Sequence, residues 1–105
     1  MTDAQLLSKV KLACRITANT TDFDDELKDL INAAFLDLSI SDVNAPGGQP
    51  YSASTVTDDI VLAVKTFVKI HFGDLASDKE KEDLKSSYDE QKAQLKMKRY
   101  SWSNL

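Results

Sequence analysis

The sequence has few of the residues that chemistry usually requires: one histidine, one cysteine and three glycines in 105 residues. A single cysteine cannot form an internal disulfide, and Cys14 occupies an apolar helical position, so we expect it to pack in the core. His71 has no nucleophile or acid linked to it in the sequence, which favours a structural role as a half-buried core histidine. No catalytic residue, metal site or cofactor site is therefore predicted.

Long apolar runs are also missing, and basic charge is limited. No segment approaches the about 20 apolar residues that a membrane span needs, and the acidic start Met1-Thr2-Asp3 has no basic or apolar signal-peptide region. We expect a protein made in a cytoplasm, without a membrane partner.

The net charge of -4 is distributed unevenly along the chain. Residues 1–59 hold ten acids against four bases, whereas residues 78–99 hold seven bases and six acids. This balance disfavours sequence-independent binding to DNA, because such binding depends on basic side chains that contact phosphates. It suits a basic end that meets the acidic end of a neighbouring copy, although solvated charged faces explain it equally well.

Hydrophobic spacing predicts one all-α domain over residues 1–105, a small bundle of about four helices. The predicted ranges are 3–15, 23–42, 57–72 and 77–98. The predicted N-terminal caps are Thr2, Thr21 or Asp22, Thr57 and Ser77, and Gly73 is the predicted stop of the third helix.

The third predicted helix contains the most informative segment, Ile60–Phe72. Only Lys65, Thr66 and Lys69 form a polar stripe on it. A helix that is apolar around most of its circumference must be covered on most sides. Because the other helices offer limited apolar surface, we expect part of the cover to come from another subunit.

Two segments are candidates for contacts with partners. Residues 43–55 hold both prolines and two of the three glycines, which predicts a long loop between the second and third helices. The fourth helix has a thin apolar stripe and extends into residues 96–105, a candidate flexible tail rich in aromatic residues. The candidate interface residues are Tyr51, Tyr88, Leu95, Met97, Tyr100, Trp102 and Leu105.

Four segments are familiar in their order, spacing and length: Leu6–Leu12 with Arg15–Thr17, then Phe23–Ala34, Val64–Gly73 and Leu84–Leu95. Together they resemble the small head-tail connector proteins of tailed bacteriophages and prophages, the head-completion or adaptor family. The resemblance covers nearly the whole chain apart from residues 44–54.

The resemblance implies a structural subunit of the virion that forms a ring of roughly a dozen copies beneath the portal protein. Such a ring extends the DNA channel and joins the head to a downstream stopper or tail protein, and DNA passes without sequence-specific binding. The resemblance brings no catalytic residues or cofactors. Candidates for facing the channel or a neighbour are the helix-start acids Asp24, Asp25, Glu26, Asp58 and Asp59, since an acidic lumen repels DNA.

Two alternatives fit the same features. A small helical nucleic-acid-binding module, such as a repressor or the small subunit of a packaging enzyme, needs a recognition helix with basic side chains near its N-terminus. The predicted helix starts here are acidic, and the only basic cluster is Lys92, Lys96, Lys98 and Arg99. The second alternative is another helical component of the same phage junction, such as a tail-completion protein.

Overall fold

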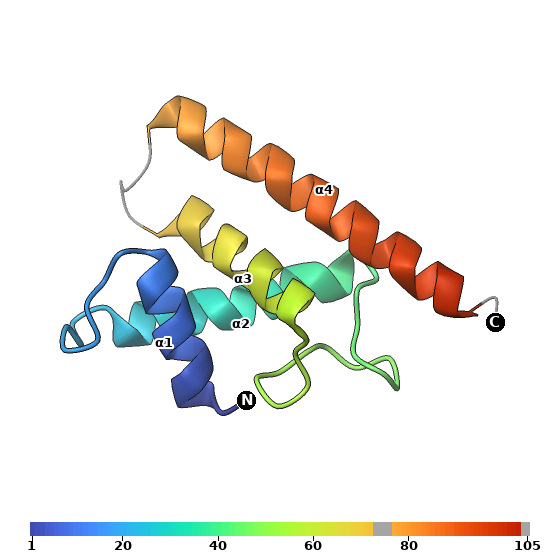
Figure 1. Cartoon of the computed structure of the whole chain (residues 1–105), viewed down its shortest axis with the longest axis horizontal. Helices are drawn as coiled ribbons and strands as arrows, with labels where there is room; N and C mark the ends of the chain where they lie inside the picture. Colours follow the sequence, from blue (N-terminus) through green and yellow to red (C-terminus); the bar gives the residue numbers. More distant parts are fainter. Residues whose placement is uncertain (73–76, 104–105) are drawn as a thin grey trace.

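The computed structural model describes residues 1–72 and 77–103, and the side chains of all of these except 99–103. These ranges form helices α1 (Asp3–Ala13), α2 (Asp24–Ile40), α3 (Asp58–His71) and α4 (Asp78–Ser103), with no strand among them. Figure 1 shows α3 in the middle, with α1 and α2 on one side and α4 along the other. The predicted small all-α bundle is confirmed. None of the described helices is long and apolar enough to cross a membrane.

The start of α1 follows the prediction closely. The Thr2 hydroxyl accepts a hydrogen bond from Gln5 N at 3.1 Å, and Thr2 N donates to Gln5 Oε1 at 2.9 Å. This reciprocal pair is a capping box, which satisfies backbone donors that the first helical turn leaves free. At α4, Glu80 N likewise donates to Ser77 Oγ at 3.2 Å.

The start of α2 differs from the prediction, which placed the cap at Thr21 or Asp22. The cap position is Phe23, and its side chain makes no capping hydrogen bond. A backbone turn precedes the helix, in which Asp24 N donates to the Thr21 carbonyl at 3.1 Å. The turn brings the Phe23 ring edge to face against Phe72, with 5.4 Å between ring centroids. A backbone turn and an aromatic contact therefore fix the start of α2, without a polar side-chain cap.

The helix ends also differ in part. The first helix ends at Ala13, and Arg15 adopts a left-handed backbone with φ of 60°. The last helix runs beyond the predicted end at Lys98 to Ser103. The predicted stop at Gly73 lies outside the described residues.

The third helix is the centre of the core. It contacts α1, α2 and α4, and seven of its 14 residues are buried. Leu62, 54 % exposed, is its one large apolar side chain that stands mostly in solvent among the described residues. The chain's own helices therefore cover most of α3, and the expectation that another subunit supplies part of its cover stays a prediction, limited to the side that carries Leu62. Fully buried side chains of the core are Leu6, Val10, Leu27, Leu38, Ile60, Val64 and Val68.

The single cysteine, Cys14, and the single histidine, His71, have different surroundings. Cys14 is 4 % exposed, as predicted. Burial raises the pKa of its thiol, and the positive charge of Lys69 partly opposes the shift. His71 is exposed rather than half-buried. Its ring centroid lies 4.3 Å from that of Phe67, on the outward side of a last helical turn whose Val68 and Ile70 side chains are buried.

Candidate assembly interface

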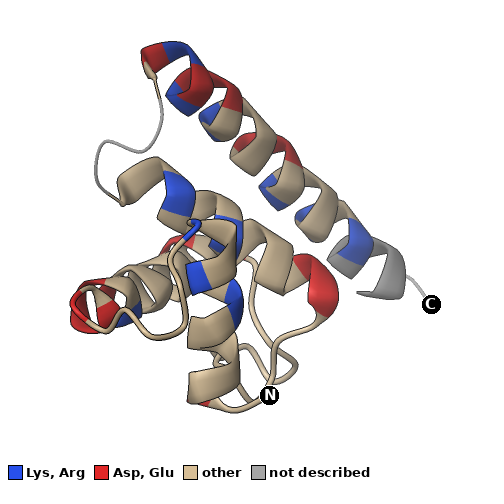
Figure 2. Ribbon diagram, turned by 60° about the vertical axis from the view of Figure 1, so that its left-hand side comes forward, with Lys and Arg blue, Asp and Glu red and all other residues tan. Residues whose placement is uncertain are grey.

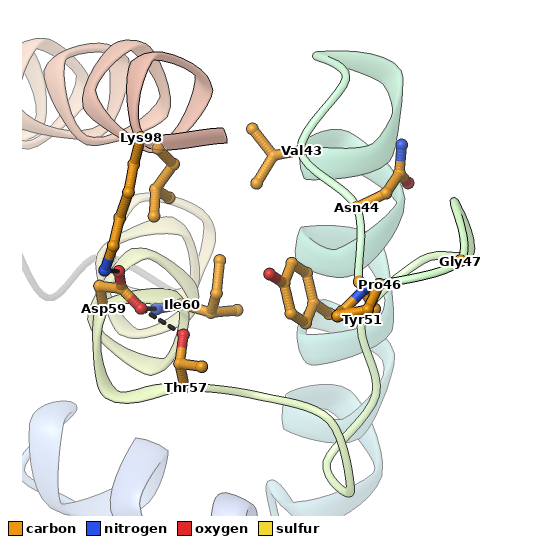
Figure 3. Close-up of a pocket in the computed structure, with 11 residues that line it drawn as sticks. Val43, Asn44, Pro46, Gly47, Tyr51, Thr57, Asp59, Ile60 and Lys98 are labelled. Carbon is orange, nitrogen blue, oxygen red and sulfur yellow. Dashed lines mark hydrogen bonds and ion pairs between the residues drawn. The ribbon is translucent and has the colours of Figure 1, made fainter. Parts of the chain in front are cut away.

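A pocket of about 450 Å³ lies where the connection between α2 and α3 meets the first turn of α3 and the end of α4. We call it the loop pocket, and Figure 3 shows its lining. Tyr51 reaches it from the connection, Ile60 and Asp59 from α3, and Leu95 and Lys98 from α4. Three residues singled out in the sequence, Tyr51, Asp59 and Leu95, are therefore brought together although they are far apart along the chain.

The connection that forms one wall is anchored rather than loosely extended. Its Val43, Ala45 and Ala53 side chains are each 4 % exposed. Ala45 N donates to the Gln49 carbonyl at 2.8 Å, which closes a tight turn. Gly47, with φ of 96°, occupies a left-handed conformation in that turn that side chains other than glycine rarely adopt. The wall of the pocket is thus a defined surface, set by backbone hydrogen bonds and buried apolar side chains.

An ion pair closes the edge of the loop pocket. Lys98 Nζ lies 2.9 Å from Asp59 Oδ2, and Asp59 Oδ1 accepts from the Thr57 hydroxyl and, at 3.0 Å, from Ile60 N. The Thr57 hydrogen bond lowers the pKa of the Asp59 carboxyl, burial opposes this, and Lys98 lowers it further. Asp59 therefore holds its negative charge while it joins the end of α4 to the start of α3.

A second polar cluster holds the middle of α4. The Tyr88 hydroxyl donates to Asp37 Oδ2 at 2.6 Å, and Lys92 Nζ approaches the same oxygen at 3.3 Å. Lys92 Nζ also lies 4.7 Å from the centroid of the Tyr88 ring. Burial, with the Asp37 carboxylate beside it, raises the pKa of the Tyr88 phenol above its usual range. Only 6 % of Tyr88 is exposed, and its ring edge packs on Phe67.

This inward position bears on the interface role predicted for Tyr88. The residue anchors α4 to its own subunit, so contact with a partner would require α4 to move first. Met97 is 69 % exposed and free to make contacts. Leu105 and the side chains of Tyr100 and Trp102 lie outside the described residues.

The predicted acids separate into two groups. Asp24 and Asp59 are paired within the subunit, with Lys11 and Lys98 respectively. The exposed members are Asp25, Glu26 and Asp58.

The buried Lys11 is a structural residue that sequence reasoning missed. It is 5 % exposed, its Nζ lies 2.9 Å from Asp24 Oδ1, and it also donates to the Ala18 carbonyl at 3.3 Å. The pair ties α1 to the start of α2 and to the turn between them. Its one sequence signal was a charged residue between the buried positions Val10 and Cys14.

Several large apolar side chains stand in solvent, and most of them were also missed. They lie off the buried line of their helices, and Leu12 alone had been recognised as off that line. The group and its exposed fractions are Leu12 at 76 %, Leu36 at 58 %, Ile40 at 85 %, Leu62 at 54 % and Met97 at 69 %. No group of three His, Cys, Asp or Glu side chains in the described ranges could hold a metal ion.

Comparison with known proteins identifies a family for the chain. A family model described as phage connector protein matches residues 6–101. Searches of curated proteins and of solved structures gave no match. The matched range includes the connection between α2 and α3 and nearly all of α4, so it spans the helices and both polar clusters described above. The chain therefore belongs to the phage connector protein family.

Proposed function

We propose that this connector protein is a structural subunit of the head-tail junction in a tailed phage or prophage virion. The family match over residues 6–101 carries the proposal. The structure supports this role because exposed apolar side chains and charged residues lie outside the core, and surfaces of this kind bind other protein subunits. No step of the proposed role requires a catalytic residue.

In this role, roughly a dozen copies form a ring beneath the portal protein, and the ring extends the DNA channel. The far side of the ring holds a downstream stopper or tail protein. DNA passes through without sequence-specific binding. The exposed acids Asp25, Glu26 and Asp58 face the channel or a neighbouring subunit, where negative charge repels DNA or attracts a basic surface.

We assign the contact with a neighbouring junction protein to the end of the molecule that carries the loop pocket. Tyr51 and Leu95 line the pocket, and the exposed Met97, two residues after Leu95, extends the contact to another face of α4. A protruding apolar side chain of a partner would be buried by these residues. Residues Tyr100–Leu105 follow Met97 in the sequence, and we assign them to the same contact.

The function is tested in the phage that encodes the protein. Inactivating the gene is expected to yield heads that fail to join tails, and supplying the intact chain is expected to restore infectious particles. Native mass spectrometry of the chain mixed with the portal protein of the same phage is expected to show several copies per portal ring. Normal tailed particles without the gene, together with no binding to the portal, would refute the proposal.

A narrower experiment tests the assigned contact. A chain lacking Tyr100–Leu105 is expected to keep nearly all of its helical circular dichroism and its unfolding midpoint, since the fully buried side chains that the structure describes lie in α1–α3. It is expected to be absent from purified particles. Normal incorporation of the shortened chain would contradict the part assigned to these residues.

A further inference from the structure

The outer side of α2 carries an acidic and apolar stripe, opposite the side of this helix that faces the core. Asp25, Asp29, Leu36 and Ile40 share one line at helical spacing. Leu36 and Ile40 are 58 % and 85 % exposed, and both aspartates are exposed. Neither aspartate makes an ion pair within the described part of the chain. The buried side of the same helix, made of Leu27, Ile31, Ala34, Phe35 and Leu38, faces the core.

A second surface, on α1 and α3, combines apolar side chains with basic charge. On α1, Lys9 and Leu12 are exposed, and on α3 the exposed Leu62 is followed one turn later by Lys65. Neither lysine has an ion-pair partner among the residues that the structure describes. Figure 2 shows basic segments of α1 and α3 close together at the centre of the view, and the acidic start of α2 at the left edge.

Two further cations near this surface are excluded from it. Arg15 and Lys69 line a separate pocket between α1 and α4, together with Glu80 and Asp83 of α4. Their positive charges therefore share this pocket with acids of the same subunit. The α1–α3 surface is defined by Lys9, Leu12, Leu62 and Lys65.

The two surfaces lie on opposite faces of a flat molecule. Both α1 and α3 pack on α2, and the exposed line of α2 lies opposite its buried line. At the edge of that line, Leu36 also borders a pocket lined by Leu6 and Leu7 of α1. The shortest dimension of the molecule is 18 Å. Figure 1, viewed down that axis, shows α1 crossing in front of α2.

We propose that the outer α2 stripe of one copy docks on the α1–α3 surface of the next copy, an inference that rests on the proposed function. Asp25 and Asp29 meet the lysines of the neighbour, and Leu36 and Ile40 cover Leu12 and Leu62. When two copies bind through two different surfaces, the resulting pair still has one free surface of each kind. Such a contact therefore propagates, and it closes into a ring when the rotation per subunit allows.

A two-fold dimer is the competing arrangement of the same surfaces. It would place the α2 stripe against itself and bring Asp25 and Asp29 close to the aspartates of the other copy. Like charges facing each other weaken an interface. The charges of the two surfaces therefore favour the head-to-tail contact over the symmetric one.

Cysteine cross-linking tests the contact directly. The chain has a single cysteine, Cys14, which is buried, so an introduced surface cysteine reacts selectively. Full-length chains carrying Ile40→Cys are mixed with separately tagged chains carrying Leu62→Cys, allowed to assemble on the portal protein and oxidised. We expect disulfide-linked dimers with one chain of each kind, because a disulfide forms only where the Cβ atoms come close.

Two controls make the cross-linking decisive. Met97 is 69 % exposed, between the values of Leu62 and Ile40, and lies outside both surfaces. Mixing Ile40→Cys with Met97→Cys is expected to give no more than about a tenth of the cross-linked yield. Efficient cross-linking of Ile40→Cys chains to each other would overturn the proposal in favour of the two-fold dimer.

Charge exchange tests the electrostatic part. Asp25→Lys with Asp29→Lys is expected to raise the dissociation constant between copies at least about tenfold, as is Lys9→Glu with Lys65→Glu. An equal mixture of the two variants is expected to assemble again, because reversed and native surfaces alternate around the ring with opposite charges in contact. If the mixture assembles no better than either variant alone, the proposed pairing is wrong.

The outcomes separate this inference from the proposed function. If the unaltered chain assembles on the portal but Ile40→Cys and Leu62→Cys do not cross-link, the pairing is overturned and the connector role stands. If the unaltered chain assembles neither alone nor on the portal, both proposals fail.

Discussion

The bundle of α1, α2 and α3 and the outer helix α4 are held in different ways. In α3, seven of 14 residues are buried, whereas the described side chains of α4 include one buried residue, Tyr88. The outer helix packs on the core through Leu84, Tyr88 and Leu95. Polar contacts of Tyr88 and Lys92 with Asp37 and of Lys98 with Asp59 hold it in addition. Gln91 Oε1 lies buried in this seam without a hydrogen-bond partner in the described structure.

The difference suggests separate roles for the two parts. Hydrophobic burial supplies most of the stability of a domain, while a few polar contacts each contribute about 1 kcal/mol. Regions with few buried contacts open at lower free energy than the core. The α1–α3 bundle therefore holds most of the buried core, and α4, whose described side chains include one buried residue, is expected to separate from the bundle at a lower free energy than the bundle needs to unfold.

The largest expected effect comes from the α1–α3 bundle. Leu38 is fully buried, so Leu38→Ala is expected to lower the free energy of unfolding by about 2–5 kcal/mol. Urea unfolding followed by circular dichroism measures this change. The matched control is Leu36→Ala on the same helix, where the side chain is 58 % exposed, and its effect is expected to stay within about 0.5 kcal/mol. Similar losses for the two variants would contradict the assignment of the core.

The next effect concerns the buried charge within that bundle. Lys11→Met leaves the Asp24 carboxylate without its partner at 2.9 Å. Because the Asp24 side chain is 24 % exposed, water can partly replace the lost charge, and we expect a loss of about 1–3 kcal/mol. Lys9→Met, at an exposed position two residues earlier, is the control in the same urea titration. Unchanged stability of the Lys11 variant would show that the ion pair contributes nothing.

A smaller, local effect is expected at the seam of α4. Tyr88→Phe removes the hydrogen bond to Asp37 but keeps the ring, at an expected loss of about 1–2 kcal/mol. Hydrogen exchange is expected to accelerate in residues 78–98 more than in α2 and α3. Tyr51→Phe is the control, because the Tyr51 hydroxyl makes no hydrogen bond in the described structure. Equal acceleration in all four helices would disprove the separate behaviour of α4.

The smallest effect is a pH dependence at Asp59. Its pKa is lower in the folded state than in the unfolded chain. Its charge therefore stabilises the fold above the unfolded pKa, and this contribution is lost as the pH falls through the folded pKa. Since Asp59 and Lys98 are 37 % and 63 % exposed, solvent screening keeps the contribution below about 0.5 kcal/mol.

Unfolding midpoints measured across the acid range test this dependence. Asp59→Asn is expected to remove part of the acid-induced loss of stability. The exposed neighbour Asp58, replaced as Asp58→Asn, is expected to leave that loss unchanged. Identical acid profiles for the two variants would assign no stabilising role to the Asp59 pair.

Local features of the fold could be predicted because they depend on residues close in sequence. Helical spacing predicted α2 and α3, the pair Thr2 and Gln5 predicted the capping box, and the position of Cys14 predicted its burial. The family resemblance, carried by the order and length of these segments, is confirmed by the match over residues 6–101.

The candidate site could be predicted only in part. Tyr51, Asp59 and Leu95 were recognised one by one, but their meeting in the loop pocket depends on how α4 crosses the start of α3. Spacing alone also suggested more uncovered surface on α3 than the structure shows. It did not predict the exposed pair Leu36 and Ile40, because an apolar residue off the buried line can still be covered by another element.

By itself, the sequence determined which segments are helices, where the first of them is capped and which family the chain resembles, since backbone preferences and hydrophobic periodicity act over a few residues. Tertiary structure alone decided that Lys11 is buried against Asp24, that Tyr88 faces Asp37 and that Lys98 reaches Asp59. Whether a side chain is buried, paired or exposed depends on which helix packs against it, and that choice is made by the free energy of the whole core.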